Sequence, residues 1–447
     1  MAKNIIEKVP FDFRLGLYDI YSDENIKYFH TYKEVDKNGK YLYWDKIKYH
    51  AKVNKDDPLI AWYSVKSHRI IGQKILLLYN KENNFFKYSV HNSLHSSLYR
   101  ISEFSKDTLM PTNSTGNKYL FSSLAIEEAI NSSQLEGALT TRKVAKDMIV
   151  SERKPRSPDE RMILNNYYLM KEVKKVKTED LSIDMILSFH EIATQGSNEN
   201  GVIPGQTRIN DDIHIVDRDG NTIYQPPKYD EVLSRLNQIC LFANENHRDT
   251  NFIHPVIKAI ILHFMIGYIH PFSDGNGRTA RALFYWFMLK SGYDYFEYIS
   301  ISKLLKEAPA KYSKAYLYTE YDDNDLNYFI YYQVDIILRA IDDLRIFLEV
   351  KSKEFEEIEE VLKDSILKDV LNFQQKDILK KSIKNPGRIF TANEVSVDYD
   401  ISPNSARTYL NKLAQSKLLI KAKDGRLITY IAPENLYNML MRAKGIK

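Results

Sequence analysis

The sequence predicts a mainly α-helical protein that carries one β-hairpin in its middle and a small α+β unit at its C-terminus. Apolar residues recur at helical spacing through most of the chain, and the longest such pattern runs from Tyr328 to about Asp369. Two short β-prone runs flank Asp219-Gly220, which is typical of a tight hairpin turn. From about Gln374 the pattern changes to three short helices followed by two β-prone runs.

Length and composition bound the class of protein. The chain has 447 residues, of which 27% are charged and 44% hydrophobic, so it can form two or three domains with a sizeable core. The chain has one cysteine, Cys240, so it cannot form an internal disulfide, which fits a reducing compartment. Cys240 lies in an apolar helical pattern, which fits a packing role. Met1-Ala2-Lys3-Asn4 is not followed by the apolar region that is typical of a secretory leader, and the most hydrophobic span, Ile260–Ile269, is too short to cross a membrane. We therefore expect a cytoplasmic protein without membrane contact.

Charge is unevenly distributed along the chain. Leu371 to Lys447 contains fourteen Lys and Arg against six Asp and Glu, a net charge of +8, whereas the whole chain carries +4 and the remainder therefore −4. A basic C-terminal unit on a mildly acidic body indicates nucleic acid as a partner.

The remaining elements follow in order. Ile70–Tyr79 and Phe85–Val90 are predicted as strands or as short buried helices, in an N-terminal part that extends to about Leu98. A helical pattern begins at Tyr119 and ends at Gly137, a residue that favours the left-handed conformation after a helix. Further helices are expected at Lys143–Ser151, Pro158–Lys174, Leu181–Ala193, Tyr229–Asn246, His254–Ile269, Ala282–Leu289, Ser302–Leu305 and Pro309–Tyr318.

These elements divide the chain into an N-terminal extension (1–98), a core (99–325), a helical spacer (326–372) and a C-terminal unit (373–447). The spacer contains Val350–Lys363, which is rich in Glu and Lys. We expect this stretch to be a solvated helix, with a homodimer contact as the alternative.

The segment His270–Arg281, with the sequence HPFSDGNGRTAR, carries the strongest chemical signal in the chain. Gly275 and Gly277 allow the backbone to approach a ligand closely and to turn its N–H groups towards it. The helix expected after them presents its positive N-terminal end to the same space, which favours an anion. Arg278 and Arg281 are three residues apart, so both can reach phosphate oxygens from one helix face.

Two further side chains in this segment suit chemistry on a bound phosphate compound. Asp274 offers the hard oxygen ligand that a Mg²⁺ ion bridging phosphates prefers. His270 titrates near neutrality, so it can take a proton from an attacking group. Together these residues predict a nucleotidyl transfer site. The alternative is a solvated glycine turn between two core helices.

HPFSDGNGRTAR is similar to the signature of the Fic family at every defined position. Fic proteins have a helical core, and most of them transfer AMP from ATP to a hydroxyl group of a target protein. The resemblance implies that His270 is the general base for that hydroxyl and that Asp274 holds Mg²⁺. It also implies that the Gly275–Gly277 backbone, together with Asn276, cradles the α- and β-phosphates with help from Arg278. Some relatives move UMP, phosphocholine or phosphate, or remove AMP, and this choice stays open.

The same resemblance assigns a regulatory role to a segment upstream of the signature. Ser132-Ser133-Gln134-Leu135-Glu136-Gly137 is similar to the Fic inhibitory motif, in which a glutamate pairs with the second arginine of the signature. In this chain that arginine is Arg281, which would otherwise receive the γ-phosphate. Ser132, Glu136 and Gly137 are therefore expected to restrain the enzyme. The alternative is a helix that ends in a solvated glutamate.

Further expectations concern the ligands of this core. Fic proteins carry a hairpin flap that docks the target segment by strand addition, and residues 213–226 occupy its place. His214 is expected to be a side chain of this flap rather than a second base. Tyr312 falls where the family places an aromatic ring beside the adenine, although aromatic residues at helical spacing are more often part of a core. His254 and His263 are expected to be packing residues, because their spacing matches no metal-binding pattern.

The C-terminal unit is similar to a winged helix-turn-helix. Ser402-Pro403 is a favourable start for its third helix. Polar residues of this helix suit the major groove of DNA, and basic residues around it suit phosphates: Asn404, Ser405, Arg407, Thr408, Asn411, Lys412, Lys417 and Arg426. Winged helices also bind proteins, so DNA and protein partners both stay open. The leading hypothesis is an autoinhibited protein adenylyltransferase that uses ATP and Mg²⁺, and the competing one is a DNA-binding regulator whose Fic domain senses nucleotide.

Overall fold

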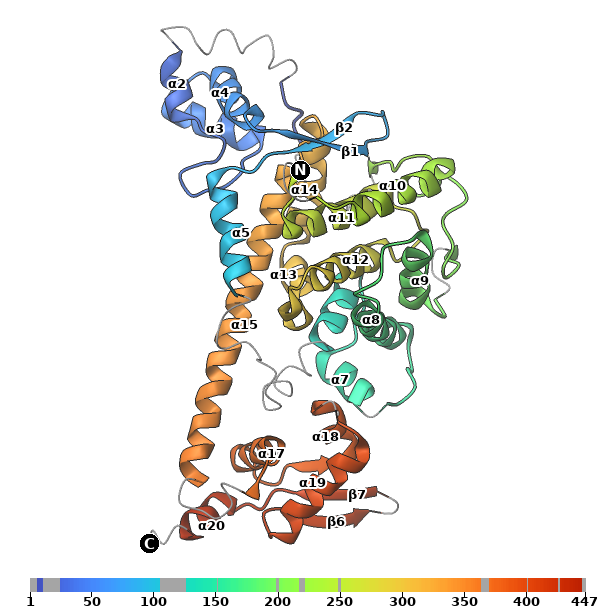
Figure 1. The fold of residues 1–447 in the computed structure, drawn as a ribbon, viewed down its shortest axis with the longest axis vertical. Helices are drawn as coiled ribbons and strands as arrows, with labels where there is room; N and C mark the ends of the chain where they lie inside the picture. Colours follow the sequence, from blue (N-terminus) through green and yellow to red (C-terminus); the bar gives the residue numbers. More distant parts are fainter. Residues whose placement is uncertain are drawn as a thin grey trace.

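The computed structural model describes residues 6–10, 25–104, 126–150, 152–197, 201–216, 222–247, 251–362, 370–399, 401–424 and 427–443. These residues form a mainly helical molecule, as predicted, with three parts arranged along its longest axis (Figure 1). A group of N-terminal helices lies at one end, a helical core lies in the middle, and a small α+β unit lies at the other end.

Two helices form the centre of the core. α11 (Pro255–Ile269) and α12 (Asn276–Lys290) pack against each other and are joined by a short loop. Almost all of their side chains are buried, because other helices cover them on every side. α8 starts at Pro158 after the N-cap Ser157, whose hydroxyl accepts the amide of Glu160. The other helices of the core are α5 (Asn92–Phe104), α7 (Arg142–Val150), α8 (Pro158–Lys175), α9 (Ile183–Thr194), α10 (Val232–Asn244), α13 (Ile301–Glu307) and α14 (Pro309–Tyr321).

The N-terminal part has a small apolar core of its own. It contains α2 (Ile26–Thr31), α3 (Trp44–Asn54) and α4 (Pro58–Ile70), followed by the antiparallel strands β1 (Lys74–Tyr79) and β2 (Phe85–Tyr88). The two apolar runs that sequence patterns could not assign to strand or helix therefore contain strands, although the first of them begins with Ile70, the last residue of α4.

A buried ion pair attaches this N-terminal part to the core. Lys66 Nζ on α4 lies 2.8 Å from Asp322 Oδ1, and both side chains are 4% exposed. The Tyr328 hydroxyl donates to Asp322 Oδ2 at 2.8 Å. Loss of either partner would leave an uncompensated buried charge, so removal of one of them should be strongly destabilising.

The predicted hairpin consists of β3 (Ile215–Val216) and β4 (Thr222–Tyr224), which pair in antiparallel orientation. Its turn at Asp219-Gly220 lies outside the described residues. A short 3₁₀ segment, η2 (Tyr229–Glu231), leads from the hairpin into α10, and η4 (Asp294–Tyr298) precedes α13.

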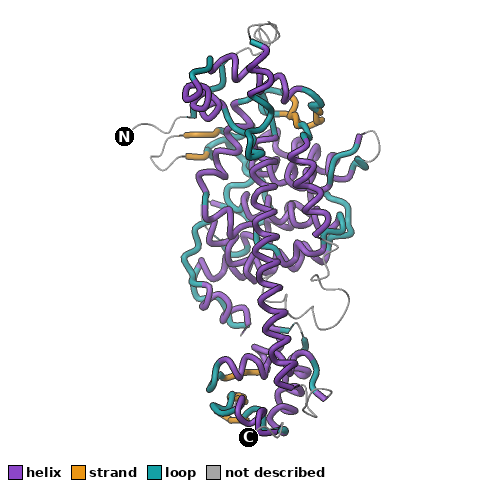
Figure 2. The backbone as a smooth tube through the Cα atoms, turned by 90° about the vertical axis from the view of Figure 1, so that its left-hand side faces the viewer, coloured by secondary structure: helices purple, strands orange, loops and turns teal. Residues whose placement is uncertain are grey.

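A single long helix, α15 (Asn327–Leu362), runs from the core to the C-terminal unit (Figures 1 and 2). Its 36 residues correspond to a length of about 54 Å. The predicted long helical pattern is thus one helix as far as residue 362, and residues 363–369 lie outside the described part. No helix in the part of the chain that the structure describes is both long enough and apolar enough to cross a lipid bilayer.

The C-terminal unit packs its helices against a three-stranded antiparallel sheet in the order β5-β7-β6. The three helices and the two-stranded ribbon were predicted, whereas β5 and α20 were not. The winged-helix assignment itself stays a prediction, and Arg426 lies outside the described residues. The elements are α17 (Phe373–Lys384), β5 (Ile389–Thr391), α18 (Ala392–Asp398), α19 (Pro403–Gln415), β6 (Ile420–Asp424), β7 (Leu427–Ile431) and α20 (Leu436–Ala443).

The C-terminal unit also contacts the core at α7. Val397 of α18 packs against an apolar cluster formed by side chains of α7, of α8 and of the helical segment 126–135. Lys146 Nζ on α7 lies 3.9 Å from Asp398 Oδ1 on α18. This cluster therefore joins the C-terminal unit to the segment that ends in the predicted inhibitory motif.

Candidate active site

A cavity of about 190 Å³ lies where the loop between α11 and α12 meets α14 and the hairpin. The structure brings His270, Asn276, Gly277, Glu136 and Tyr312 to its wall, and these residues were all predicted from sequence motifs. The other residues that line it are Ile215, Ile223, Tyr224, Gly267, Tyr268, Ser313, Tyr316, Leu317 and Glu320.

His270 ends α11 in the left-handed conformation, with φ 50°. Its amide donates to the Ile266 carbonyl at 3.0 Å, and its own carbonyl accepts Arg208 Nε at 3.0 Å. Nδ1 lies 3.4 Å from the Gly267 carbonyl, and a proton held there leaves Nε2 as the acceptor. Burial lowers the pKa of His270 below its usual value. The ring is therefore neutral at neutral pH and able to accept a proton.

Contacts on two sides fix the loop between α11 and α12. The Asn276 side chain bridges this loop, because Nδ2 donates to the Phe272 carbonyl at 2.8 Å and Oδ1 accepts from the Phe272 amide at 3.0 Å. The His190 ring of α9 stacks on the Phe272 ring with 3.7 Å between centroids. Its Nδ1 accepts from the Gly205 amide at 3.1 Å, which leaves Nε2 as the donor to the Asp274 carbonyl at 3.0 Å. Burial lowers the pKa of His190 to about 4, so this ring is also neutral.

Sequence reasoning missed His190, because it lies in an apolar helix and belongs to no spacing pattern. The glycine opposite it was recognised. Gly275 has φ +80°, and a Cβ there would lie 2.7 Å from Thr194 Cγ2 and 3.2 Å from His190 Cδ2. The close fit between the loop and α9 therefore requires glycine at this position.

Glu136 and Arg281 form an ion pair beside the cavity. Arg281 Nη2 donates to Glu136 Oε1 at 2.8 Å, and Nε donates to Ser132 Oγ at 2.9 Å. Burial would raise the pKa of Glu136, but the Arg281 charge and hydrogen bond outweigh it and hold the pKa below its usual value. A Cβ on Gly277 would lie 2.2 Å from Glu136 Oε1, so the carboxylate sits directly over the start of α12. Arg281 Nη1 is buried and finds no partner among the described residues.

The helical segment 126–135 ends where the inhibitory motif predicts. Gly137 has φ +105°, and its amide donates to the Gln134 carbonyl at 3.2 Å. Lys306 of α13 binds the side chains of Asn131 at 2.9 Å and Gln134 at 2.6 Å. The end of the segment is therefore held against the core with Glu136 facing Arg281.

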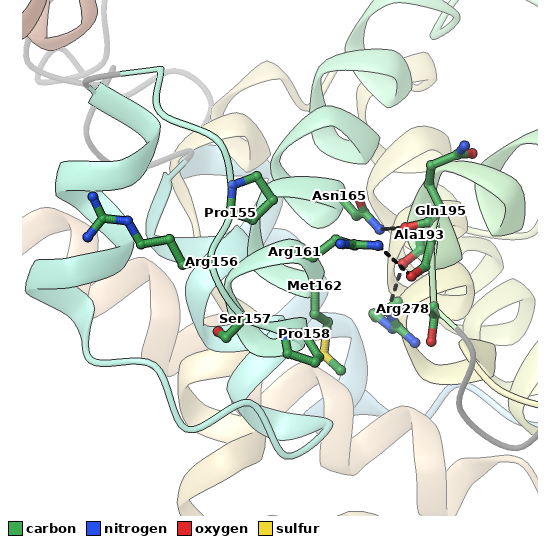
Figure 3. A pocket seen from close by; sticks show the side chains of 12 residues that line it. Pro155, Arg156, Ser157, Pro158, Arg161, Met162, Asn165, Ala193, Gln195 and Arg278 are labelled. Carbon is green, nitrogen blue, oxygen red and sulfur yellow. Dashed lines mark hydrogen bonds between the residues drawn. The ribbon is translucent and has the colours of Figure 1, made fainter.

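Arg278 does not line the cavity that contains His270, although its spacing from Arg281 suggested that both would contact phosphates there. Its Nη1 donates to the Ala193 carbonyl at 2.7 Å, and its Nη2 donates to Asp274 Oδ2 at 2.8 Å. It lines a second cavity of about 440 Å³, which shares no lining residue with the first (Figure 3). There, Arg161 and Asn165 also donate to carbonyl groups beyond the last turn of α9 (Figure 3). Arg278 and Asp274 thus support the loop through α9, outside the cavity that contains His270.

Tyr312 and Tyr316 form the wall of the cavity opposite the loop. The Tyr312 hydroxyl lies 2.7 Å from His263 Nε2, and burial lowers the pKa of His263 to about 3. His263 is therefore a buried, neutral partner of Tyr312, consistent with the packing role expected for it. A Cβ on Gly267 would lie 2.3 Å from the Tyr316 hydroxyl oxygen. The contact between Gly267 and Tyr316 is a second feature that no motif indicated.

The hairpin forms another wall. Ile215, Ile223 and Tyr224 line the cavity, and the Tyr224 hydroxyl donates to the Tyr268 carbonyl at 2.7 Å. His214, directly before β3, is exposed, and its role in a flap stays a prediction. The hairpin and His270 therefore line the same cavity.

The sequence around this cavity is similar to that of known proteins. Residues 180–288 match the model of the Fic/DOC family. The protein adenylyltransferase fic-1 of Caenorhabditis elegans is 33% identical over 115 residues, which cover 26% of this chain and 20% of that protein. The protein adenylyltransferase Fic of Nematostella vectensis is 38% identical over 64 residues, which cover 12% of this chain and 15% of that protein. This chain thus spans a fifth or less of the length of these curated relatives.

Solved structures of Fic proteins are also similar. A Fic family protein from Desulfovibrio desulfuricans has a TM-score of 0.49 at 15% identity, and the match covers 77% of this chain and 97% of that chain. A fragment of Fic-1 from C. elegans has a TM-score of 0.47 at 19% identity, with 58% and 73% covered. The family match includes the loop between α11 and α12 together with the helices on both sides of it. The chain therefore contains a domain of the Fic/DOC family at residues 180–288.

Proposed function

We propose that this chain is a protein adenylyltransferase that moves AMP from ATP to a hydroxyl group of a target protein and is restrained by Glu136. The Arg281–Glu136 pair over Gly277, next to the cavity that contains His270, carries this proposal. A guanidinium with one unpartnered nitrogen, the N-terminus of a helix and a neutral histidine in one place suit the transfer of a phosphate-linked group. The names of the curated relatives support the same activity.

The transfer would proceed by in-line displacement. His270 takes the proton of the target hydroxyl at Nε2, and the target oxygen forms a bond to the α-phosphorus of ATP. The bond from that phosphorus to the oxygen bridging to the β-phosphate breaks, and pyrophosphate leaves. The backbone N–H groups at the start of α12 and the Arg281 guanidinium stabilise the charge on the phosphates. Glu136 opposes this reaction, because its carboxylate and the γ-phosphate compete for Arg281.

Asp274 is the residue that would hold Mg²⁺, which would neutralise charge on the phosphates. The described residues contain no group of three or more His, Cys, Asp or Glu side chains arranged to hold a metal. One carboxylate combined with substrate phosphates and water is nevertheless an ordinary Mg²⁺ donor set. Asp274 accepts from Arg278 Nη2 at 2.8 Å and does not line the cavity that contains His270, so a metal bound together with ATP would have to draw its carboxylate from this ion pair.

Intact mass measurements on the purified chain test the proposal. Wild type, Glu136→Gly and His270→Ala are incubated with labelled ATP and Mg²⁺. We expect an added mass of one AMP in Glu136→Gly, little in wild type and none in His270→Ala. An adduct of UMP or phosphate when UTP or another donor replaces ATP would change the assigned donor, and transfer by His270→Ala at the parental rate would remove His270 as the base. No adduct in any variant, with ATP binding retained, would favour a nucleotide sensor.

A second candidate function concerns the C-terminal unit. We propose that it is a winged helix that binds DNA, because it carries a net charge of +8 and because α19 exposes Asn404, Arg407 and Thr408. The apolar side of α19 faces the core of the unit through Leu410 and Leu413. Mobility shift of a mixed-sequence DNA pool with the full chain should be weakened by Arg407→Ala. An equal shift with both proteins would show that Arg407 does not contact the DNA, and no shift with either would favour a protein partner for this surface.

A further inference from the structure

A buried arginine at the base of the hairpin takes no part in the reaction as described. Arg208 is 4% exposed. Its Nε donates to the His270 carbonyl at 3.0 Å, and its Nη1 donates to the Asn210 carbonyl at 3.0 Å and to Asp211 Oδ1 at 2.8 Å. Its Nη2 donates to the Pro227 carbonyl. One guanidinium is thus shared by three separate parts of the chain.

These three parts are the end of α11 and both ends of the hairpin. Asn210 and Asp211 precede β3, Pro227 follows β4, and His270 is the C-cap residue that follows α11. The backbone amide of Arg208 adds a further link, since it donates to the Pro271 carbonyl at 2.9 Å. Any shift of the hairpin relative to His270 would therefore break bonds to a buried charge.

His270 depends on such support for its position. It has a left-handed backbone, which residues other than glycine adopt rarely, and its carbonyl is one of the last four of α11, which lack partners within the helix. Arg208 Nε supplies the partner for this carbonyl. The backbone of the residue that would accept the proton is thus fixed by Arg208, at the base of the hairpin.

We propose that Arg208 is a positioning residue that couples the target-docking hairpin to the general base. A target segment paired with the hairpin then meets His270 at a fixed distance and direction. This inference rests on the proposed function and adds to it the route by which target docking and base placement are linked. Arg208 does not line the cavity that contains His270, so it would act through the position of His270.

The chain offers a matched control. Arg235 of α10 is also buried, at 6% exposure, and it donates to the carbonyl groups of Tyr79 at 2.8 Å and Asn80 at 3.1 Å. It pairs with Glu231 at 2.7 Å, as Arg208 pairs with Asp211. Arg235 does not line the cavity, so the change in stability and rate on its substitution measures the effect of removing a buried arginine alone.

The charge of Arg208 provides a second readout. Burial is the largest cause of the lowered pKa of His270; the Arg208 cation lowers it further, whereas the Gly267 carbonyl and the carboxylates of Glu136 and Asp274 raise it. Loss of the cation should therefore raise the pKa of His270. Because the base must be neutral, the acidic limb of the rate profile should move to higher pH.

The experiment measures self-modification of the full chain in the Glu136→Gly background, with ATP and Mg²⁺, by intact mass. Arg208→Gln should lower the maximum rate about tenfold or more, leave the KM for ATP within about twofold, and move the acidic limb to higher pH. Arg208→Lys keeps the charge but not the fork of donors, so it should restore the acidic limb without restoring the maximum rate. Arg235→Gln should lower thermal stability and leave the rate within about twofold of its parent.

Equal losses of rate in Arg208→Gln and Arg235→Gln, or an unchanged rate in Arg208→Gln, would overturn the positioning role. If Arg208→Gln does not fold, Arg208→Lys decides the question, and a parental rate in that variant overturns the proposal. An inactive Glu136→Gly parent would instead overturn the proposed adenylyl transfer, and the positioning role with it.

Discussion

Glu136→Gln tests the charge of the Arg281 pair while it keeps a side chain over Gly277. The variant removes the negative charge that lies 2.8 Å from Arg281 Nη2. A hydrogen bond to a charged group contributes about 1.5–3 kcal/mol, and the 31% exposure of the Glu136 side chain places this one at the lower end. About 1.4 kcal/mol corresponds to a factor of ten. We therefore expect Glu136→Gln to raise the rate of AMP transfer about tenfold, and Glu136→Gly to raise it further because the cover over Gly277 is also lost.

The assay follows the early rate of self-modification with labelled ATP and Mg²⁺ at a fixed protein concentration. Glu172→Gln serves as the control, because Glu172 pairs with Lys175 on the surface of α8, away from the cavity. Equal rates in wild type and Glu136→Gln would refute the view that the ion pair restrains the enzyme. Equal rates in Glu136→Gln and Glu136→Gly would show that the cover over Gly277 contributes nothing beyond the charge.

The pH dependence of this restraint has a definite sign. The pKa of Glu136 is held below the ordinary carboxyl value of 4.5. A group with a lowered pKa keeps its ion pair above the ordinary value and loses it only as the pH falls through the lowered one. The ratio of the rates of Glu136→Gln and wild type should thus stay constant from about pH 8 to about pH 6. A ratio that falls towards one over this range would contradict the assigned ionisation.

Three further predictions concern residues around the cavity and the C-terminal contact. Gly267→Ala places a Cβ 2.3 Å from the Tyr316 hydroxyl oxygen, so it should weaken ATP binding, measured by calorimetry with Mg²⁺ present. Gly292→Ala meets no neighbouring atom but strains a backbone with φ +86°, so it should lower stability and leave ATP binding unchanged. His190 is buried with a pKa of about 4, so its protonation on unfolding should lower stability as the pH falls from about 6.5 to about 4, and the thermal midpoint of His190→Gln should depend less on pH in that window. Val397→Asp puts a charge into the cluster that holds the helical segment 126–135, so it should raise the rate of self-modification, and an unchanged rate would separate the C-terminal unit from the restraint.

Local patterns were sufficient to predict the loop and the helices that carry it. The glycines, His270 and the two arginines lie within one short segment, so their order alone indicates a phosphate site. The stop at Gly137 follows for the same reason, because a helix end is a local property. Distant pairing was harder: the contact between Glu136 and Arg281 joins residues far apart in sequence, and only the family resemblance indicated it.

Residues that act through tertiary contacts could not be found from sequence patterns. Arg208 and His190 hold the loop from other segments, and neither belongs to a motif with a chemical meaning of its own. The direction of Arg278 was also beyond a spacing argument. Arg278 and Arg281 share a helix face, but the carbonyl groups at the end of α9 attract the first, whereas Ser132 and Glu136 attract the second. The direction of each arginine side chain depends on which buried acceptors lie within its reach, and the whole fold places those acceptors.

The packing of Val397 against the cluster below the helical segment 126–135 has a thermodynamic consequence. Suppose that this contact changes the strength of the ion pair between Glu136 and Arg281. The binding of a ligand to the C-terminal unit and the binding of ATP to the cavity that contains His270 would then be linked by one coupling free energy. Such coupling acts equally in both directions. A ligand of the C-terminal unit that loosened the segment would favour ATP by some factor, and ATP bound in place of Glu136 would strengthen that ligand by the same factor. Binding at the C-terminal unit would then change the affinity of the core for ATP, and ATP would change the affinity of the C-terminal unit for its ligand.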